Sequence, residues 1–232
     1  MEEITIVQNG FDAAYISYLY GKVKERFSFL PSSCDLLRRG DCCTIAFKTE
    51  KEYCPYVRRF AEETMADVFA VGYKYRYFQE KIRVPLLNKT EKQILFTALV
   101  AADYREDKSY VLHKIKGLQN YCLDGVYHFC LQSLKERWQG VAEYVPADMG
   151  VSALDEFLRF LAEDGDGKVF VKGGKVYDEE YRPLSKSQLT GSPSVINEIL
   201  LCGAERVYCF GDTEKDVAAF LKKYYREKAV FC

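Results

Sequence analysis

The chain is predicted to be an α+β protein, with a central antiparallel helical bundle between small αβ units at the N- and C-termini. Three observations predict this class: strand patterns occur only near the two ends, amphipathic helical patterns follow one another in the middle, and the links between those helices are short. We expect a β-α-β unit over residues 1–50, the helical bundle over 51–148 and an αβ unit over 149–232, packed as one compact structure.

The N-terminal unit is predicted from two short strands around one helix. Residues 3–7 alternate apolar and polar side chains, and Asn9-Gly10 ends this strand. Apolar residues at helical spacing predict a helix over 12–27, which Pro31 closes. A second strand is predicted at 43–47.

The first helix of the middle segment is expected to start near Tyr53, with Pro55 in the first turn, where the missing N–H has no cost. Apolar residues recur along one side of it: Val57, Phe60, Ala61, Val68, Val71, Tyr75 and Phe78. Charged residues, Lys74 among them, lie away from this stripe, so one face is expected in the core and the other in water. Pro85 should end the helix by Arg83 or Val84.

Three further helices follow in the middle segment. Asn88 and Glu91 match a capping box for a helix that runs to about Tyr104. Asp107 is expected to cap a short second helix and Asp124 a third, which Pro146 ends.

The only tryptophan, Trp138, lies in the third of these helices. Leu134 and Val141 are its helical neighbours on the apolar side, and Lys135 lies on the polar side. We therefore expect Trp138 to be buried and to anchor this helix.

The C-terminal segment combines a hairpin with further helices. A helix over 154–162 is followed by short apolar runs at 169–171 and 176–177, and Gly173-Gly174 between these runs predicts a tight hairpin. Ser192-Pro193 should open the next helix.

The last elements are predicted from their boundary residues. Gly203 suits the left-handed position at the end of the preceding helix. Strands are expected at Arg206–Phe210 and Ala229–Phe231, on either side of a helix over 213–223 that Asp212 would cap.

The charge balance argues against two classes of partner. The chain has 33 Lys and Arg residues against 34 Asp and Glu residues, a formal net charge of −1. Proteins that bind nucleic acid or anionic membranes generally carry a basic excess, so neither partner is expected. The apolar run 94–102 is about half the length of a bilayer span, and the opening Met1-Glu-Glu-Ile-Thr is acidic, unlike an export signal. We expect a cytoplasmic protein with no membrane span and with a protein partner.

The cysteines predict neither disulfides nor a metal site. There are nine, an odd number, and no two are separated by the two residues of a CxxC pair. Zinc sites usually show such paired spacing, whereas Cys130, Cys202 and Cys209 fall on apolar patterns where a thiol acts as a small hydrophobe. No cofactor is expected.

The sharpest local motif is Phe210-Gly-Asp-Thr-Glu-Lys-Asp216. Asp212 and Asp216 resemble the acidic pair that holds magnesium in haloacid-dehalogenase-type phosphatases. That chemistry needs a second acidic pair after another strand, and the sequence has only Asp164-Gly-Asp166, which follows a helix and is expected to lead into no βαβ unit. The favoured interpretation is that Asp212 is an N-cap, and that Glu214 and Asp216 favour the positive end of the helix dipole.

Other patterns also favour structural roles. The spacing around Asp164 does not match a calcium loop, so a tight turn is expected there. His113 and His128 have no ligand partners at metal-binding spacing, and each is expected to be a partly buried structural histidine. The aromatic and basic runs 72–78 and 222–226 could stack bases, but lysine and arginine that lie over a core fit them better.

One segment of the chain resembles a known family. The third helix of the middle segment opens with Leu123-Asp-Gly-Val-Tyr-His-Phe-Cys-Leu131, and this run, within residues 96–145, resembles the YtxC-like family of sporulation proteins of endospore-forming Firmicutes. A weaker likeness continues through residues 192–196 and 206–207. The resemblance implies a role in endospore formation and brings no active-site residues. We therefore expect a non-enzymatic cytoplasmic accessory protein that acts through protein contacts, with a magnesium-dependent hydrolase using Asp212 and Asp216 as the alternative.

Overall fold

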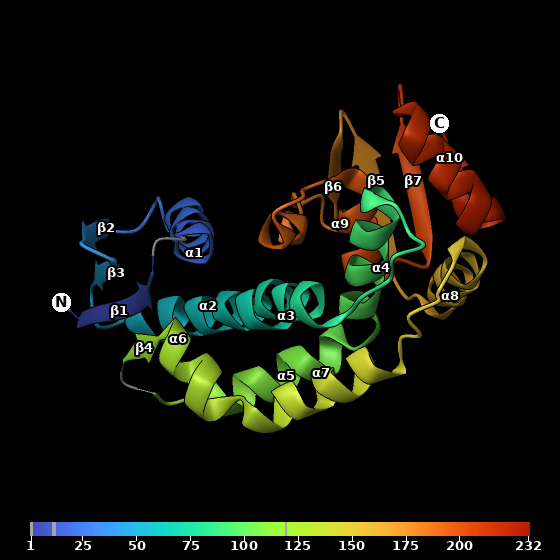
Figure 1. The fold of residues 1–232 in the computed structure, drawn as a ribbon. Helices are drawn as coiled ribbons and strands as arrows, with labels where there is room; N and C mark the ends of the chain where they lie inside the picture. Colours follow the sequence, from blue (N-terminus) through green and yellow to red (C-terminus); the bar gives the residue numbers. More distant parts are fainter. Residues whose placement is uncertain (1, 11–12, 119) are drawn as a thin grey trace. The chain divides into compact units, whose positions relative to one another are not determined.

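The computed structural model describes residues 2–10, 13–118 and 120–232 (Figure 1). The α+β class is confirmed: 56% of the chain is helical and 19% is strand, in two mixed four-stranded sheets, one N-terminal and one C-terminal, with helices between them. The chain forms two compact units. The N-terminal unit joins Met1–Tyr73 to Arg105–Trp138, and the C-terminal unit joins Lys74–Tyr104 to Gln139–Cys232.

The N-terminal sheet has the strand order β2-β3-β1-β4. Its strands are β1 (Glu2–Asn9), β2 (Ser32–Arg39), β3 (Cys42–Thr49) and β4 (Tyr121–Cys122). The strands predicted at 3–7 and 43–47 are confirmed as β1 and β3. The sequence analysis missed β2, an exposed edge strand without apolar alternation, and the two-residue β4, which is too short to show a period.

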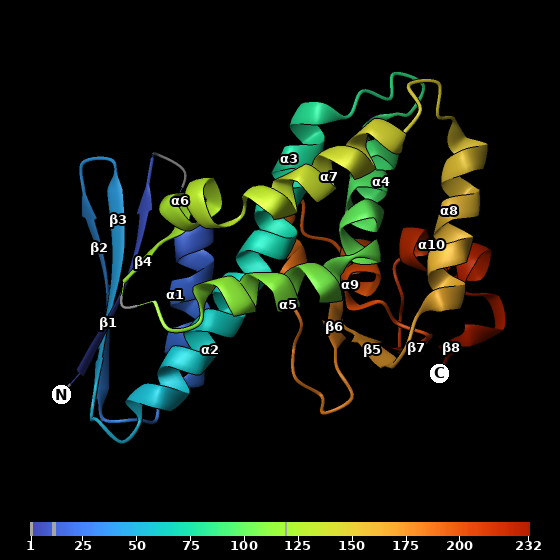
Figure 2. The same cartoon turned by 90° about the horizontal axis from the view of Figure 1, so that it is seen from below.

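One face of this sheet packs against α1 (Ala14–Arg26), as Figure 2 shows. The expected start of that helix, residue 12, lies outside the described residues. The remaining helices of the unit are α2 (Cys54–Asp67), the π-helical segment Val68–Tyr73, α5 (Tyr104–Ile115), α6 (Leu123–Gly125), the π-helical segment Val126–Cys130 and α7 (Gln132–Tyr144). Both α5 and α7 extend across the boundary between the two units.

The first middle helix starts where predicted, and its predicted apolar stripe continues to the buried Tyr75 and Phe78. Tyr53 is the N-cap of α2, with Pro55 at its first positions. All residues of the π-helical segment are buried, so around this segment the core surrounds the helix and is not confined to one stripe. Lys74 was expected to face water, and this expectation is wrong: its side chain is 0% exposed and forms an ion pair with Asp103 at 3.3 Å. The helix ends with α3 (Lys74–Lys81), before the boundary that Pro85 predicted.

The capping box of α4 (Lys89–Ala102) is confirmed. The Asn88 side chain accepts a hydrogen bond from the Glu91 backbone N–H at 3.0 Å, and the Glu91 carboxylate accepts one from the Asn88 N–H at 2.7 Å. Both partners lie within four residues of each other, so local geometry alone sets this helix start.

The predicted caps Asp107 and Asp124 are wrong, because both carboxylates bind distant groups instead. Asp107 lies inside α5 and accepts a hydrogen bond from the Trp138 indole N–H at 2.8 Å. Asp124 accepts hydrogen bonds from the Asn9 backbone N–H at 2.7 Å and from the Tyr73 hydroxyl at 3.2 Å. The burial expected for Trp138 is confirmed, since it is 1% exposed.

The C-terminal sheet has the strand order β6-β5-β7-β8. Its strands are β5 (Lys168–Lys172), β6 (Lys175–Tyr177), β7 (Arg206–Phe210) and β8 (Ala229–Phe231). Gly173 and Gly174 join β5 to β6 with φ values of 57° and 71°, the backbone that a two-residue hairpin turn requires. The hairpin and the two later strands are confirmed.

The helices of the C-terminal unit are α3, α4, α8 (Val151–Asp164), the 3-10 helix Lys186–Thr190, α9 (Val195–Cys202), α10 (Lys215–Tyr224) and the 3-10 turn Arg226–Lys228. The Ser194 hydroxyl caps α9 by accepting a hydrogen bond from the Asn197 backbone N–H at 3.1 Å. Gly203 ends α9 in the left-handed conformation, as predicted. Among the described residues, no helix combines the length and apolar composition needed to cross a membrane.

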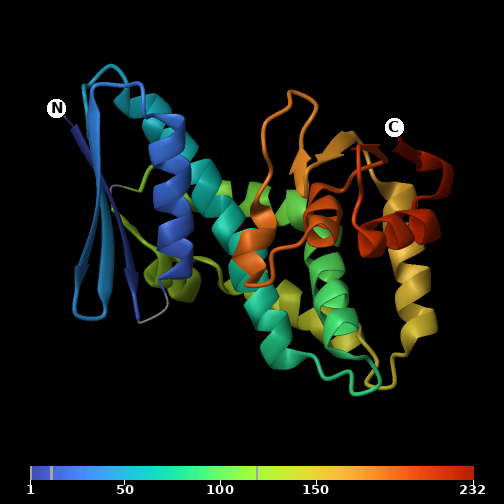
Figure 3. The same ribbon diagram turned by 90° about the horizontal axis from the view of Figure 1, so that it is seen from above.

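Helices cover only one face of the C-terminal sheet. The chain passes from β5 through α9 to the parallel β7, and then through α10 to the parallel β8. Both crossovers move across the sheet in the same direction, so both helices belong on the same face, and Figures 2 and 3 show them there. The path from β5 through α9 to β7 is a βαβ unit, so the expectation that Asp164-Gly-Asp166 leads into none is wrong.

Candidate functional site

The structure corrects the role predicted for Asp212. Helix α10 begins at Lys215 with Glu214 as its N-cap, and no side chain caps it. Asp212 lies instead in the exposed connection that follows β7. Asp216 is in the first turn of α10 and Lys222 is in the last, so the predicted complement to the helix dipole is confirmed.

The two acidic motifs lie at opposite ends of the sheet. Asp166 comes two residues before β5, whereas Asp212 comes two residues after β7. These strands are parallel, with Lys168 opposite Arg206. Each strand has 5 residues, so the two motifs are separated by the length of a strand, about 16 Å. A phosphatase-type site needs its carboxylates at one edge, and this arrangement does not provide that.

The segment Asp164-Gly-Asp-Gly167 connects α8 to β5 as an irregular stretch that bends at Gly167 and hydrogen-bonds to a distant segment, and not as the tight turn that was predicted. The Asp166 backbone N–H donates to the Gly203 carbonyl oxygen at 2.9 Å, and the Glu205 N–H donates to the Gly167 carbonyl oxygen at 3.0 Å. A Cβ atom on Gly165 would lie 2.5 Å from the Ala204 carbonyl oxygen. This connection therefore requires glycine because another backbone segment approaches it closely.

The histidines and cysteines form no metal site that the structure describes. His113 and His128 are both exposed, so the expectation of partly buried histidines is wrong. All nine cysteines are free thiols. Within residues 2–10, 13–118 and 120–232, no group of three or more His, Cys, Asp or Glu side chains is placed to hold a metal ion.

The two aromatic and basic runs, residues 72–78 and 222–226, do not form base-stacking surfaces. Tyr73, Lys74 and Tyr75 of the first run are buried. In the second run, the Lys223 ammonium lies 2.7 Å from the Asp155 carboxylate, and the Tyr224 hydroxyl donates to the same group at 2.5 Å. Both runs therefore support the fold.

A polar cluster ties β4 to α2 in the N-terminal unit. The Tyr121 hydroxyl donates to the Glu62 carboxylate at 2.6 Å and accepts a hydrogen bond from the Arg58 guanidinium at 3.2 Å. Burial, together with the hydrogen bond to Glu62, raises the pKa of Tyr121 to about 12. Tyr121 is therefore neutral at physiological pH and acts as a structural link.

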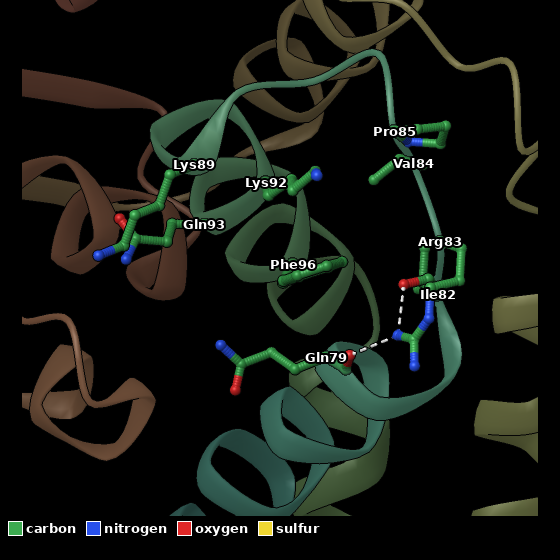
Figure 4. Close-up of a pocket in the computed structure, with 9 residues that line it drawn as sticks. All are labelled: Gln79, Ile82, Arg83, Val84, Pro85, Lys89, Lys92, Gln93 and Phe96. Carbon is green, nitrogen blue, oxygen red and sulfur yellow. Dashed lines mark hydrogen bonds between the residues drawn. The ribbon is translucent and has the colours of Figure 1, made fainter.

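The C-terminal unit contains a pocket of about 620 Å³ between the end of α3 and the start of α4 (Figure 4). Its volume lies in the range of pockets that hold small ligands or side chains of a partner. The pocket is lined by Gln79, Ile82, Arg83, Val84, Pro85, Lys89, Lys92, Gln93 and Phe96. Ile82, Val84 and Phe96 are buried and provide an apolar floor.

The charged residues that line this pocket are all cationic. Arg83 is held in place because its guanidinium donates to the carbonyl oxygens of Gln79 at 3.1 Å and Ile82 at 3.3 Å, at the end of α3. Neither Lys89 nor Lys92 forms an ion pair with a carboxylate in the described part of the chain. The pocket therefore suits a ligand that is both anionic and partly apolar.

The pocket has the chemistry of a binding site. Its lining contains no Ser, Cys, His, Asp or Glu side chain that could act as a nucleophile or a general base. The sequence analysis missed this site, since three cations around Pro85 give no recognisable motif.

Comparison with known proteins identifies no relative: no family model, no curated protein and no solved structure matches the chain. The resemblance to the YtxC-like family therefore stays a prediction.

Proposed function

We propose that this protein is a non-enzymatic accessory protein that acts by binding another protein. The pocket between α3 and α4 is the observation that carries the proposal. It combines an apolar floor with three cations, and its lining contains no Ser, Cys, His, Asp or Glu side chain. Such a pocket recognises its ligand by charge and shape.

The occupant is an acidic segment of the partner that carries one large apolar side chain. The apolar side chain would contact Phe96 and Val84, while carboxylates would pair with Lys89 and Lys92 at the rim. These two lysines have no carboxylate partner within the described residues, so a bound acidic segment would supply the missing countercharge.

The process in which this binding takes part is the second element of the proposal. The resemblance of residues 123–131 to YtxC-like proteins supports a role in endospore formation, in the cytoplasm of the sporulating cell. The resemblance concerns the third middle helix and names no partner.

Selection from a phage-displayed random peptide library tests the pocket directly. We expect full-length protein to enrich peptides in which Asp or Glu residues flank a Phe or Leu residue. The double variant Lys89→Glu/Lys92→Glu should weaken the binding of a selected peptide about tenfold or more, because it reverses the charge at the rim. The exposed Lys215, on α10, provides the matched control Lys215→Glu, which should leave affinity unchanged.

Two results would contradict the proposal. One is the selection of peptides without acidic residues, or of peptides whose affinity the double variant does not change. The other is magnesium-dependent hydrolysis of p-nitrophenyl phosphate that Asp212→Ala abolishes, which would establish the hydrolase instead. A pull-down from sporulating cells would then ask whether the captured protein contains the selected type of segment.

A further inference from the structure

The face of the C-terminal sheet that α9 and α10 do not cover is aromatic. Alternation along the strands places Val169, Val171 and Val207 on the buried face. The intervening residues face the other way: Phe170 on β5 and Tyr208 on β7 are half-buried, and Phe210 is 37% exposed. Strands of parallel pairs are normally covered on both faces, so this face is unusual.

The strand register places these side chains in a row. Tyr177 on β6 is paired with Phe170 on β5, Phe170 with Tyr208 on β7, and Tyr208 with Val230 on β8. The Phe170 ring centroid lies 5.6 Å from that of Tyr208 and 6.1 Å from that of Phe210. Flat rings therefore cover adjacent strands of the open face.

Cations border this row at both ends of the strands. Lys168 is paired with Arg206 before the aromatic row, and Lys172 with Lys175 after it. All four residues are exposed, and the strand positions on this face include no acidic residue. In the loop after β6, Arg182 pairs with Asp178 and Glu180, and the Glu179 carboxylate accepts a hydrogen bond from the Lys168 backbone N–H.

The loop after β6 adds a ring above the sheet. Tyr181 stacks on Phe170 with centroids 4.7 Å apart and an angle of 12° between the rings. Its φ of 57° is uncommon for a residue other than glycine. The Asp178 carboxylate holds this turn by accepting hydrogen bonds from the backbone N–H groups of Glu180 at 3.0 Å and Arg182 at 2.8 Å. The strained backbone thus presents a Tyr181 ring that is 64% exposed.

We infer that this face binds single-stranded nucleic acid. Bases would stack on Tyr208, Phe210 and the outer side of Tyr181, because exposed aromatic rings accept any base. Phosphates would contact the two pairs of cations, which lie on either side of the row. The balanced net charge of the whole chain predicted no such partner. The four cations are spread over about 40 residues of the sequence, but the fold brings them together on one face.

Fluorescence anisotropy with the full-length protein tests this inference. The probes are a labelled oligo-dT and an oligo-U of about 15 nucleotides, together with a duplex of the same length. We expect both single strands to bind more tightly than the duplex, and Phe210→Ala and Tyr208→Ala each to weaken binding about tenfold. Tyr144→Ala removes a more exposed ring, 90% exposed on α7, and should change nothing.

A charge variant keeps the test independent of aromatic packing. Lys172→Ala/Lys175→Ala alters only exposed side chains and should reduce the slope of log affinity against log salt by roughly 1.4, the value for two lost phosphate contacts on a single strand. Lys215→Ala is its control.

The inference is overturned if single strands bind no more tightly than the duplex, or if Phe210→Ala binds like the wild type. It is also overturned if sedimentation shows a dimer that Phe210→Ala dissociates while no oligonucleotide binds, because a second copy of the chain would then cover the face. The pocket between α3 and α4 lies outside this face, so the outcome does not depend on the proposed protein partner.

Discussion

The N-terminal and C-terminal sheets each have four strands and one helix-covered face, but their opposite faces differ. On the N-terminal sheet, Thr5 is paired with Ala46 and Val7 with Thr44, and Glu3 forms an exposed ion pair with Lys48 at 3.7 Å. On the C-terminal sheet, the corresponding row is made of Tyr177, Phe170 and Tyr208. This N-terminal face also carries Leu37, which is paired with Thr44 and is 49% exposed, but it has no row of aromatic rings like the one that exposes apolar area on the C-terminal face.

This difference indicates which sheet face is better suited to binding a partner. Antiparallel strands commonly leave one face in water, and β1, β2 and β3 are antiparallel. In the C-terminal sheet, parallel strands with a bare aromatic face depart from that pattern. The C-terminal face is therefore better suited to a partner than the N-terminal face, where Leu37 is the large apolar side chain most exposed among those described.

The largest expected effect concerns the stability of the N-terminal unit and does not involve the aromatic face of the C-terminal unit. Trp138→Ala should lower the free energy of unfolding by about 3–5 kcal/mol, because it leaves a cavity and removes one of the hydrogen bonds to the buried Asp107 carboxylate, which keeps its ion pair with Arg137. Urea denaturation, followed by circular dichroism, measures the loss. Lys135→Ala is the control: Lys135 lies 5.0 Å from the centroid of the Tyr127 ring, and its loss should cost below about 1 kcal/mol.

Fluorescence provides a check on the same residue. Native emission should be blue-shifted and should move to the red on denaturation, since Trp138 is 1% exposed. Emission near that of free tryptophan, with a normally folded variant, would contradict the burial of this ring and make it a surface anchor instead.

The next effect concerns the framework of the C-terminal sheet. Gly165→Ala should destabilise the protein by about 1–3 kcal/mol, because its Cβ would lie 2.5 Å from the backbone oxygen of Ala204. Gly140→Ala in α7 meets no atom within 4 Å and should stabilise the helix by up to about 1 kcal/mol. Thermal unfolding of the two variants distinguishes them, and equal melting temperatures would contradict the close approach that positions β5 beside β7.

A smaller effect depends on pH. Burial would raise the pKa of Asp155, but hydrogen bonds from Lys223 and Tyr224 outweigh it and hold that pKa below its ordinary value of 3.8. The group therefore adds stability at neutral pH, which is lost as the pH falls below 3.8. Asp155→Asn should cost about 1 kcal/mol at pH 7 by removing an ion pair of α8 with α10. Urea titrations give the free energy of unfolding of the wild type and of the variant. A difference between these two free energies that does not become smaller in acid would contradict this role.

The smallest effect tests the N-terminal face. Lys48→Ala removes an ion pair between side chains that are 46% and 47% exposed, so the free energy of unfolding should change by less than about 0.5 kcal/mol. Oligonucleotide affinity should also stay the same. A marked loss of either would show that the N-terminal face is more than a solvated surface.

Local interactions explain what could be predicted from the sequence. The Asn88–Glu91 capping box, the Gly173-Gly174 hairpin and the left-handed Gly203 each depend on a few consecutive residues. Their backbone preferences and hydrogen bonds need no distant partner, so composition and spacing are sufficient. The strands Arg206–Phe210 and Ala229–Phe231 follow from their apolar character alone.

The tertiary structure decided which distant residues meet. Asp107 and Asp124 look like caps, yet their partners are 31 and, at the farthest, 115 residues away. Packing on all sides of residues 68–75 buried Lys74, and the strand register assembled the aromatic row from segments that are separate in the sequence. A pattern along one chain shows which side chains share a face of an element, but only packing decides which elements are neighbours and whether that face is covered.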